Sequence, residues 1–118
     1  KLFKYGEQGR DYIYVKDVVD VMAWFLIRPK ANGIFNLGTG QARSWNDLAM
    51  ATFDAMSKPV NIYYIPMPES IRDRYQYFTQ ADMGKLAKAG CKLKPMSIEA
   101  GVKDYVQNYL SNAANPYL

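Results

Sequence analysis

Histidine is absent from this 118-residue sequence, and cysteine occurs only once, at Cys91. The lack of histidine excludes any catalytic triad with an imidazole base, and with a single cysteine the usual Cys/His zinc sites are excluded too. One cysteine cannot form an internal disulfide, which fits a reducing compartment. The longest apolar run, residues 21–27, has seven residues, far short of the roughly 20 that a membrane-spanning helix needs.

The overall composition is that of an ordinary globular protein. Hydrophobic residues make up 49% of the chain and charged residues 22%, which is enough apolar material for one domain with a core. The formal net charge of +4 favours an anionic partner, either a nucleotide or a nucleic acid. The sequence begins Lys-Leu-Phe, with neither an initiator methionine nor a signal-peptide pattern, so we expect this start to lie inside a longer chain.

Periodicity in the first third predicts a strand, a helix and a second strand. Residues 11–15 alternate like a strand, and the next helix is predicted to start at an Asp17 cap and to stop at Pro29. The apolar residues at helical spacing, assigned to its inner face, are Val18, Val21, Met22 and Phe25. Residues 34–37 are predicted to be a strand covered on both faces, which needs neighbouring strands that this chain does not contain.

The middle of the chain continues the alternation of helices and strands. Ser44 and Asp47 form a capping-box pattern that opens a helix ending near Ser57. Residues 60–65 are predicted to be a strand, after which the prolines from Pro66 onward impose an irregular loop. Strands alternating with helices indicate an α/β fold.

Two more helices are predicted in the C-terminal third. Thr79 and Asp82 suggest a second capping box, with Gly90 terminating that helix. Ser97 is predicted to cap the last helix. Its apolar face is formed by Ile98, Val102, Tyr105, Val106 and Tyr109. The polar tail after Ser111 is expected to be frayed.

Two segments imitate catalytic signatures, and we interpret both as structural. Residues 38–43 (GTGQAR) lack the third glycine of a dinucleotide-binding loop and have no acidic residue about 20 positions later, so a plain strand-to-helix turn is the better interpretation. Tyr12 and Lys16 have the Tyr-x-x-x-Lys spacing, but that pair works on a helix, where the two side chains are neighbours. On the strand predicted here they would lie roughly 13 Å apart.

Two segments rich in basic and aromatic residues are candidate binding sites. Residues 72–82 (RDRYQYFTQAD) place two guanidinium groups beside aromatic rings and can grip a diphosphate. The open alternative is a solvated turn with Tyr77 and Phe78 buried. Residues 3–11 (FKYGEQGRD) combine glycines with Arg10, whose planar fork suits phosphate; the open alternative is a surface arrangement with the neighbouring Asp11.

Four segments together resemble a known family. They are RDYIYVKDV (residues 10–18), GIFNLGTG (33–40), YIPMP (64–68) and RYQYFTQAD (74–82). In order and spacing they resemble the C-terminal third of the ADP-L-glycero-D-manno-heptose 6-epimerases, which are extended short-chain dehydrogenases/reductases. The first two segments are similar to many such enzymes, whereas the last is particular to the heptose epimerases. The resemblance covers nearly the whole chain.

The resemblance implies that residues 1–118 are the C-terminal substrate-binding part of an NADP-dependent epimerase whose N-terminal Rossmann domain is absent from this chain. Such enzymes invert a carbon of ADP-glycero-manno-heptose by transient oxidation and re-reduction, and they serve lipopolysaccharide synthesis in the bacterial cytoplasm. Residues 34–37 would return to complete the Rossmann sheet. We expect NADP to be bound mainly by the absent domain, the enzyme to be a homo-oligomer without nucleic-acid or membrane partners, and this chain alone to be inactive.

Matching motif positions also implies which residues contact the ADP-sugar substrate. They are Phe3, Lys4, Tyr5, Gly6, Arg10 and Tyr75. Arg10 is expected to neutralise the diphosphate, Tyr75 to help hold it, and Phe3 to line the nucleotide site. Arg74 is added on its chemistry and adjacency alone. No catalytic, cofactor-binding or metal-binding residue is expected within this chain.

Three alternatives stay open. One is another extended short-chain dehydrogenase, such as a UDP-sugar epimerase or a dTDP-sugar dehydratase. A second is a non-catalytic nucleotide-binding or assembly domain. A third is a nucleic-acid-binding module built on the basic and aromatic residues at 72–78, which would bind single strands with a steep salt dependence. If residues 34–37 and the helix after Asp17 pack on a missing half, their apolar faces are exposed here, and the isolated chain is predicted to be poorly soluble, oligomeric or held by another chain.

Overall fold

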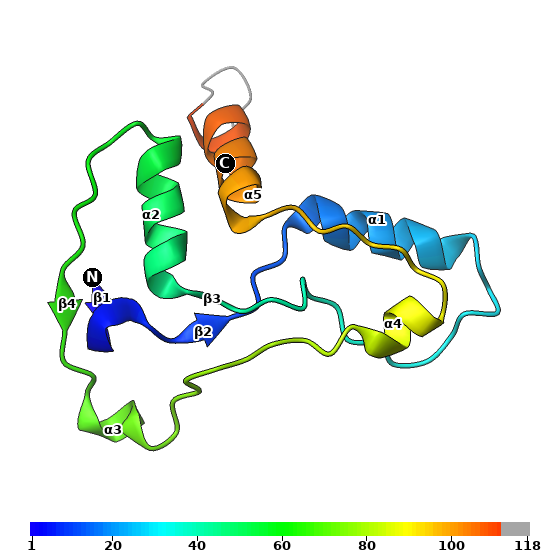
Figure 1. Cartoon of the computed structure of the whole chain (residues 1–118), viewed down its shortest axis with the longest axis horizontal. Coiled ribbons are helices and arrows are strands. Elements are labelled where there is room, and N and C mark those ends of the chain that lie inside the picture. Colours follow the sequence, from blue (N-terminus) through cyan, green and yellow to red (C-terminus); the bar gives the residue numbers. More distant parts are fainter. Residues whose placement is uncertain (112–118) are drawn as a thin grey trace.

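Short helices and two-residue strands, joined by long connections, make up the structure, a computed structural model in which residues 1–111 are described (Figure 1). The elements in chain order are β1 (Leu2–Phe3), the 3₁₀ turn η1 (Lys4–Gly6), β2 (Gly9–Arg10), α1 (Val15–Leu26), β3 (Arg43–Ser44), α2 (Trp45–Ala55), β4 (Tyr64–Ile65), α3 (Glu69–Arg72), α4 (Gly84–Lys88), α5 (Ile98–Tyr105) and the π-helical turn η2 (Val106–Leu110). This composition confirms the α/β class. The predicted fraying after Ser111 lies outside the described residues.

The strands form two separate pairs. β1 runs parallel to β4, and β2 runs antiparallel to β3. Each pair is two residues long, so neither forms a sheet that could carry a core. The pairs instead hold two short stretches of backbone in place, the start of the chain against β4 and Gly9–Arg10 against β3.

Three segments predicted to be strands form little or no ladder within the described part of the chain, although residues 34–37 were expected to need neighbouring strands that this chain does not contain. Residues 11–14 have no regular secondary structure, residues 34–37 form no strand, and only Tyr64–Ile65 of residues 60–65 belongs to a strand. The reason is the same for the unpaired stretches, because a strand needs a partner for its backbone groups and no strand of residues 1–111 pairs with residues 11–14, 34–37 or 60–62. Ile34 is 87% exposed, which agrees with the expectation that this segment needs neighbours that the chain does not contain.

The first helix begins two residues before its predicted cap. Tyr14 is the N-cap of α1, and Asp17 lies in the first turn. The Asp17 carboxylate is buried and accepts a hydrogen bond from the backbone N–H of Met96 at 3.0 Å. Asp17 therefore ties the connection before α5 to α1, a tertiary role that replaces the predicted capping role.

A small core lies between α1 and α4. Val21, Leu86 and Cys91 are its buried members. The hydrophobic residues packed around them are Trp24, Phe25, Phe35, Leu37, Met83 and Leu93. Met22, which was assigned to the inner face, is 60% exposed. That assignment was wrong because α1 is covered only along the narrow stripe centred on Val21.

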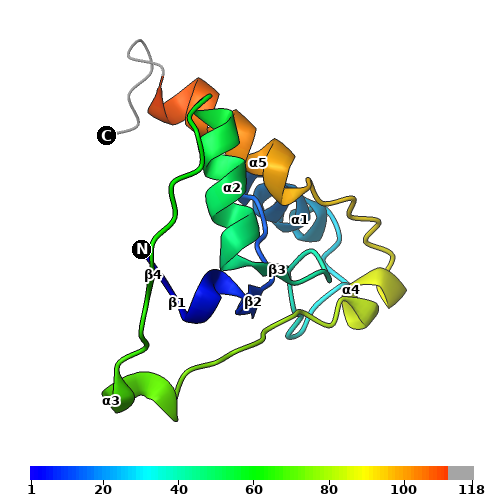
Figure 2. The same cartoon turned by 60° about the vertical axis from the view of Figure 1, so that its left-hand side comes forward.

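The helices α2 and α5 pack side by side (Figure 2) and begin at the predicted caps. Ser44 Oγ accepts from the backbone N–H of Asp47 at 3.0 Å, and the Asp47 carboxylate accepts from the N–H of Ser44 at 2.9 Å. Ser97 Oγ accepts from the N–H of Ala100, which confirms the cap of α5. Tyr105, predicted to face inward, is 45% exposed.

The predicted capping box before α4 is also wrong. The helix starts at Gly84 with Met83 as N-cap and no side-chain cap. Thr79 lies outside it, because its backbone N–H donates to the carbonyl of Gly9 at 3.1 Å. Gly90 follows the helix with φ of +94°, which agrees with its predicted role as a terminator.

The whole molecule is flat and open. Its extents are 48 × 44 × 22 Å and its radius of gyration is 16.9 Å, whereas a compact domain of this length has about 13.5 Å. The connection from β4 to α3 runs along the outer edge, on the side away from α1, before the chain returns to α4 beside α1 (Figure 1). Large apolar side chains therefore remain on the surface.

Candidate functional site

The backbone of Gly9 and Arg10 is held from both sides. β2 pairs with β3, so that Arg10 lies opposite Arg43. On the other side, the N–H of Gly9 donates to the carbonyl of Tyr77 at 2.9 Å, and its carbonyl accepts from the N–H of Thr79. The two candidate binding segments, residues 3–11 and 72–82, are thus joined directly at Gly9, next to Arg10.

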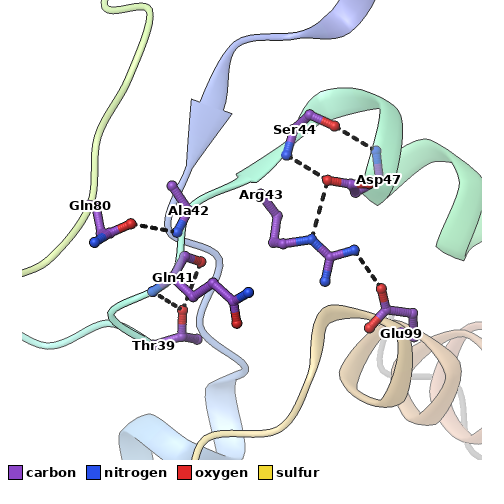
Figure 3. Close-up of polar contacts among 8 residues, drawn as sticks. All are labelled: Thr39, Gln41, Ala42, Arg43, Ser44, Asp47, Gln80 and Glu99. Carbon is purple, nitrogen blue, oxygen red and sulfur yellow. Dashed lines mark hydrogen bonds and ion pairs between the residues drawn. The ribbon is translucent and has the colours of Figure 1, made fainter.

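Arg10 and Arg43 lie opposite each other but have different surroundings. The Arg43 guanidinium pairs with Asp47 at 3.2 Å and with Glu99 at 2.6 Å, linking the start of α2 to α5 (Figure 3). The hydrogen bond from Arg43 is the main cause that lowers the pKa of Glu99. At Asp47 burial is the largest single effect and would raise the pKa, but the hydrogen bonds from Arg43 and Ser44 outweigh it, so that pKa is lowered too. Arg10 forms no ion pair with any residue in 1–111. Its charge is therefore available to an anion.

Arg10, Tyr75 and Phe3 come together, and we call them the arginine–aromatic cluster. Arg10 donates to the backbone carbonyls of Gly9, at 2.8 Å, and Gln76. Its guanidinium carbon lies 5.5 Å from the centroid of the Tyr75 ring, and Phe3 meets the same ring edge-on at 6.4 Å. These contacts orient the guanidinium while leaving it without a counter-charge in the described residues, an arrangement suited to a phosphate.

Residues 4–6 form a tight turn beside this cluster. Tyr5 has φ of +62° and Gly6 has φ of +69°. The Tyr5 ring is 70% exposed and lies 6.0 Å from the ring of Tyr64, whereas Gly6 is buried. The side chain of Lys4 lies outside the described residues.

The structure does not bring Arg74 into the cluster. Arg74 is exposed, and its side chain makes no hydrogen bond or ion pair with the described residues; its backbone N–H donates to Ile71. The alternative of a turn with buried rings is also wrong, because Tyr77 is 41% and Phe78 is 65% exposed. Tyr77 contacts the Tyr75 ring at 5.6 Å.

The Tyr12 and Lys16 pair has no catalytic geometry. Tyr12 precedes α1 and stacks edge-on against Trp45 at 5.6 Å. Burial raises the pKa of Tyr12 to about 12, which is the wrong direction for a proton-transferring phenol at neutral pH. Lys16 lies on α1 and pairs with Asp104 at 2.7 Å.

The glycine-containing turn at residues 38–40 is occupied by Asp11. The Asp11 carboxylate accepts from the backbone N–H groups of Thr39 at 2.7 Å and Gly40 at 2.9 Å. Asp11 therefore does not pair with Arg10, as the surface alternative supposed. Because these N–H groups are taken, the turn itself offers no cradle for a phosphate.

Two further side chains support the turn at residues 4–6, and sequence reasoning missed both. Asn46, on the first turn of α2, donates to the carbonyl of Tyr5 at 2.6 Å, and Gln8 donates to the carbonyl of Phe3 at 3.2 Å. Asn46 belongs to none of the candidate binding segments, and Gln8 lies within residues 3–11 but was not singled out there. Only the fold brings Asn46 next to a loop about 40 positions earlier in the chain.

Other site types have little support in the described part of the chain. Residues 1–111 contain no group of three or more potential ligands that could hold a metal ion. None of the helices found there is long and apolar enough to cross a bilayer.

Comparison with known proteins gives the chain a family. Residues 1–38 match the model of the NAD-dependent epimerase/dehydratase family. An ADP-L-glycero-D-manno-heptose-6-epimerase from Nitratidesulfovibrio vulgaris is 55% identical over 113 residues, which are 96% of this chain. The chain belongs to the NAD-dependent epimerase/dehydratase family. It spans 35% of the length of that relative.

Solved structures of the NAD-dependent epimerase/dehydratase family show the same fold. The heptose epimerase from Helicobacter pylori has 29% identity and a TM-score of 0.68; the match covers 91% of this chain and 31% of that one. The UDP-glucose 4-epimerase from Thermus thermophilus, in complex with NAD, has 26% identity and a TM-score of 0.69 over 86% of this chain and 32% of that one. These likenesses confirm the resemblance to extended short-chain dehydrogenases drawn from the sequence.

Proposed function

We propose that these 118 residues form the C-terminal, substrate-binding part of an NADP-dependent epimerase that acts on ADP-glycero-manno-heptose. The observation that carries this proposal is the geometry at Arg10 in a chain 55% identical to such an epimerase. The Arg10 guanidinium lies over the Tyr75 ring, Phe3 contacts that ring, and the guanidinium has no carboxylate partner in the described residues. Arg10 neutralises the diphosphate, Tyr75 holds it, and Phe3 lines the nucleotide site, with residues 4–6 closing one side.

In this proposal the reaction is shared with an N-terminal Rossmann domain that this chain does not include. That domain holds NADP, which supplies the transient oxidation and re-reduction, and the present residues bind and orient the sugar nucleotide. The length of the relatives supports this division, as does the exposed apolar surface of α1 and Ile34. Residues 34–37 would gain strand partners in that sheet, and α1 would be covered by it.

The proposal also includes the setting of the enzyme. The relatives' substrate is a bacterial sugar nucleotide, so we place the protein in lipopolysaccharide synthesis in the bacterial cytoplasm. It would be a homo-oligomer, with neither nucleic acid nor membrane among its partners, and this chain would be inactive when isolated.

The site assignment is tested by substitutions in the whole natural polypeptide. Arg10→Ala removes the charge that faces the diphosphate and is expected to weaken ADP-heptose binding at least about tenfold. Tyr75→Phe is expected to weaken it less, because the ring under Arg10 remains. Binding of NADP, followed by fluorescence titration, should not change in either variant.

Matched controls lie elsewhere on the chain. Arg28 is also exposed, lies over a ring (Trp24, at 4.8 Å) and donates to a backbone carbonyl, but it is at the far end of α1. Arg28→Ala and the exposed Tyr63→Phe should leave substrate binding intact. Unchanged substrate affinity in both Arg10→Ala and Tyr75→Phe would show that the cluster is not the site.

The second candidate function is that of an epimerase for a UDP-sugar, favoured by the likeness to the Thermus thermophilus UDP-glucose 4-epimerase. The two candidates differ in the nucleotide. Competition of ADP, UDP and dTDP for the substrate site separates them, because the heptose epimerase should be inhibited selectively by ADP.

A further inference from the structure

The turn at residues 4–6 has a backbone conformation that its sequence does not favour. Tyr5 has φ of +62°, in the left-handed region that residues with a Cβ rarely occupy. Tyr5 is one of two non-glycine residues with positive φ in the described part of the chain. Such a conformation persists only where surrounding groups hold it.

Asn46 supplies that support from the first turn of α2. Its Nδ2 donates to the carbonyl of Tyr5 at 2.6 Å, and its Oδ1 accepts from the hydroxyl of Tyr64 at 3.1 Å. Both ends of one amide are therefore used, one on the turn and one on β4. The rings of Tyr5 and Tyr64 lie 6.0 Å apart beside it.

The fit around Asn46 is too close for a side chain at the neighbouring glycine. A Cβ on Gly6 would lie 2.2 Å from Asn46 Oδ1 and 2.8 Å from Leu2 Cδ1. Gly6 itself has φ of +69°. The turn is thus shaped against the Asn46 amide, and a second amide, that of the buried Gln8, holds the carbonyl of Phe3.

We infer that Asn46 is a positioning residue for substrate binding. It holds residues 4–6 in their left-handed turn, and through that turn it keeps Phe3 against Tyr75 and beside Arg10. The inference rests on the proposed function and adds to it a residue outside every motif. Asn46 does not touch the reacting groups, so its effect is expected on substrate affinity and not on the chemical step.

The test is a set of variants in the whole natural polypeptide. Asn46→Ala removes both hydrogen bonds and is expected to raise the KM for the sugar nucleotide about tenfold, since an unpaired carbonyl and a strained turn remain. The kcat and the NADP affinity should stay unchanged. Asn46→Asp keeps the acceptor for Tyr64 but loses the donor to Tyr5, so it should resemble Asn46→Ala.

Tyr64→Phe provides an independent route that keeps the asparagine. It removes only the hydroxyl that orients the amide, so the KM should rise less than in Asn46→Ala. In the double variant the KM should rise by the same factor as in Asn46→Ala alone, because Asn46→Ala already removes the hydrogen bond that Tyr64→Phe removes. The control is Asn61→Ala, since Asn61 is exposed and its side chain makes no hydrogen bond within residues 1–111; its KM should match the wild type.

The outcomes separate this inference from the proposed function. The measurements use whichever of the ADP-, UDP- or dTDP-sugars the wild type binds. If the wild type prefers a UDP-sugar, the proposed substrate is corrected, but the KM values of the Asn46 variants measured with that sugar still test the positioning role. An unchanged KM in Asn46→Ala and Tyr64→Phe would overturn the positioning role, and so would a fall in kcat and NADP affinity together with the change in KM. A wild type that binds none of these sugar nucleotides would overturn both the positioning role and the proposed function.

Discussion

The carboxylate of Asp11 joins three segments that are distant in the sequence. It accepts from Thr39 and Gly40 on one segment and from the N–H of Ala81, at 3.0 Å, on another. Burial alone would raise the pKa of Asp11, but hydrogen bonds from the Thr39 hydroxyl and the three N–H groups outweigh it and lower the pKa. Gly38 makes room, because a Cβ there would lie 2.5 Å from the carboxylate.

At this scale the first prediction concerns Asp11→Asn. The amide keeps the shape but turns an NH₂ group toward N–H donors, so the contact should weaken by roughly 2 kcal/mol. Hydrogen exchange in the whole natural polypeptide should show faster exchange at Thr39, Gly40 and Ala81. The exposed Asp73→Asn is the control, and equal protection in both variants would argue against a structural role for Asp11.

At the scale of elements, α1 and α5 are joined by a polar cluster around Asp104. Its carboxylate accepts from Lys16 at 2.7 Å, from the Tyr14 hydroxyl and from Asn108. These hydrogen bonds, with that of Lys16 the largest, lower the pKa of Asp104 to about 2. Desolvation, followed by the bond to Asp104, raises the pKa of Tyr14 to about 12.

The lowered pKa predicts how this link depends on pH. A carboxylate with a lowered folded-state pKa contributes stability that is fully present above its ordinary value of 3.8 and is lost as pH falls toward about 2. The contact between α1 and α5 should therefore persist at pH 4 and weaken only below it. Titration of the Asp104 carboxyl by NMR checks this; a midpoint near 3.8, or one that Lys16→Met leaves unchanged, would contradict it.

For the whole molecule, the surface of α1 decides behaviour in solution. Val15, Val19, Met22 and Leu26 are each more than half exposed and follow one another at i, i+4, i+7 and i+11, so they form one apolar stripe. Ile34 adds to the exposed apolar surface. A stripe of this length in a flat molecule with a small core is a site for association.

The prediction at this scale is that the isolated 118 residues self-associate. Light scattering after size exclusion should show species larger than the 13.5 kDa monomer. Met22→Lys with Leu26→Lys should shift the material toward monomer, whereas Lys30→Glu, a charge change outside the stripe, should not. A cooperative, monomeric melt of the unaltered chain would refute the role given to the stripe.

Local chemistry was enough to predict the parts of the fold that depend on neighbouring residues. The caps at Ser44 and Ser97 and the terminator at Gly90 were predicted correctly because their hydrogen bonds or backbone angles involve only adjacent residues. The motif around Arg10 and the one around Tyr75 were also recognised. The structure brings Arg10, Tyr75 and Phe3 together, and their role in substrate binding stays a prediction.

The tertiary structure decided what depends on distant partners. The strands expected at residues 11–15 and 34–37 have no ladder, since pairing needs a second strand and not only an alternating pattern. The fold likewise brings together segments 28 to 70 positions apart, which gives Asp11 its contacts and lets Asn46 support Tyr5. Met22 is exposed because no distant segment covers its side of α1. Sequence alone thus determined the family, the caps of α2 and α5 and the end of α4, while only the fold determined which distant side chains support Asp11 and the turn at residues 4–6.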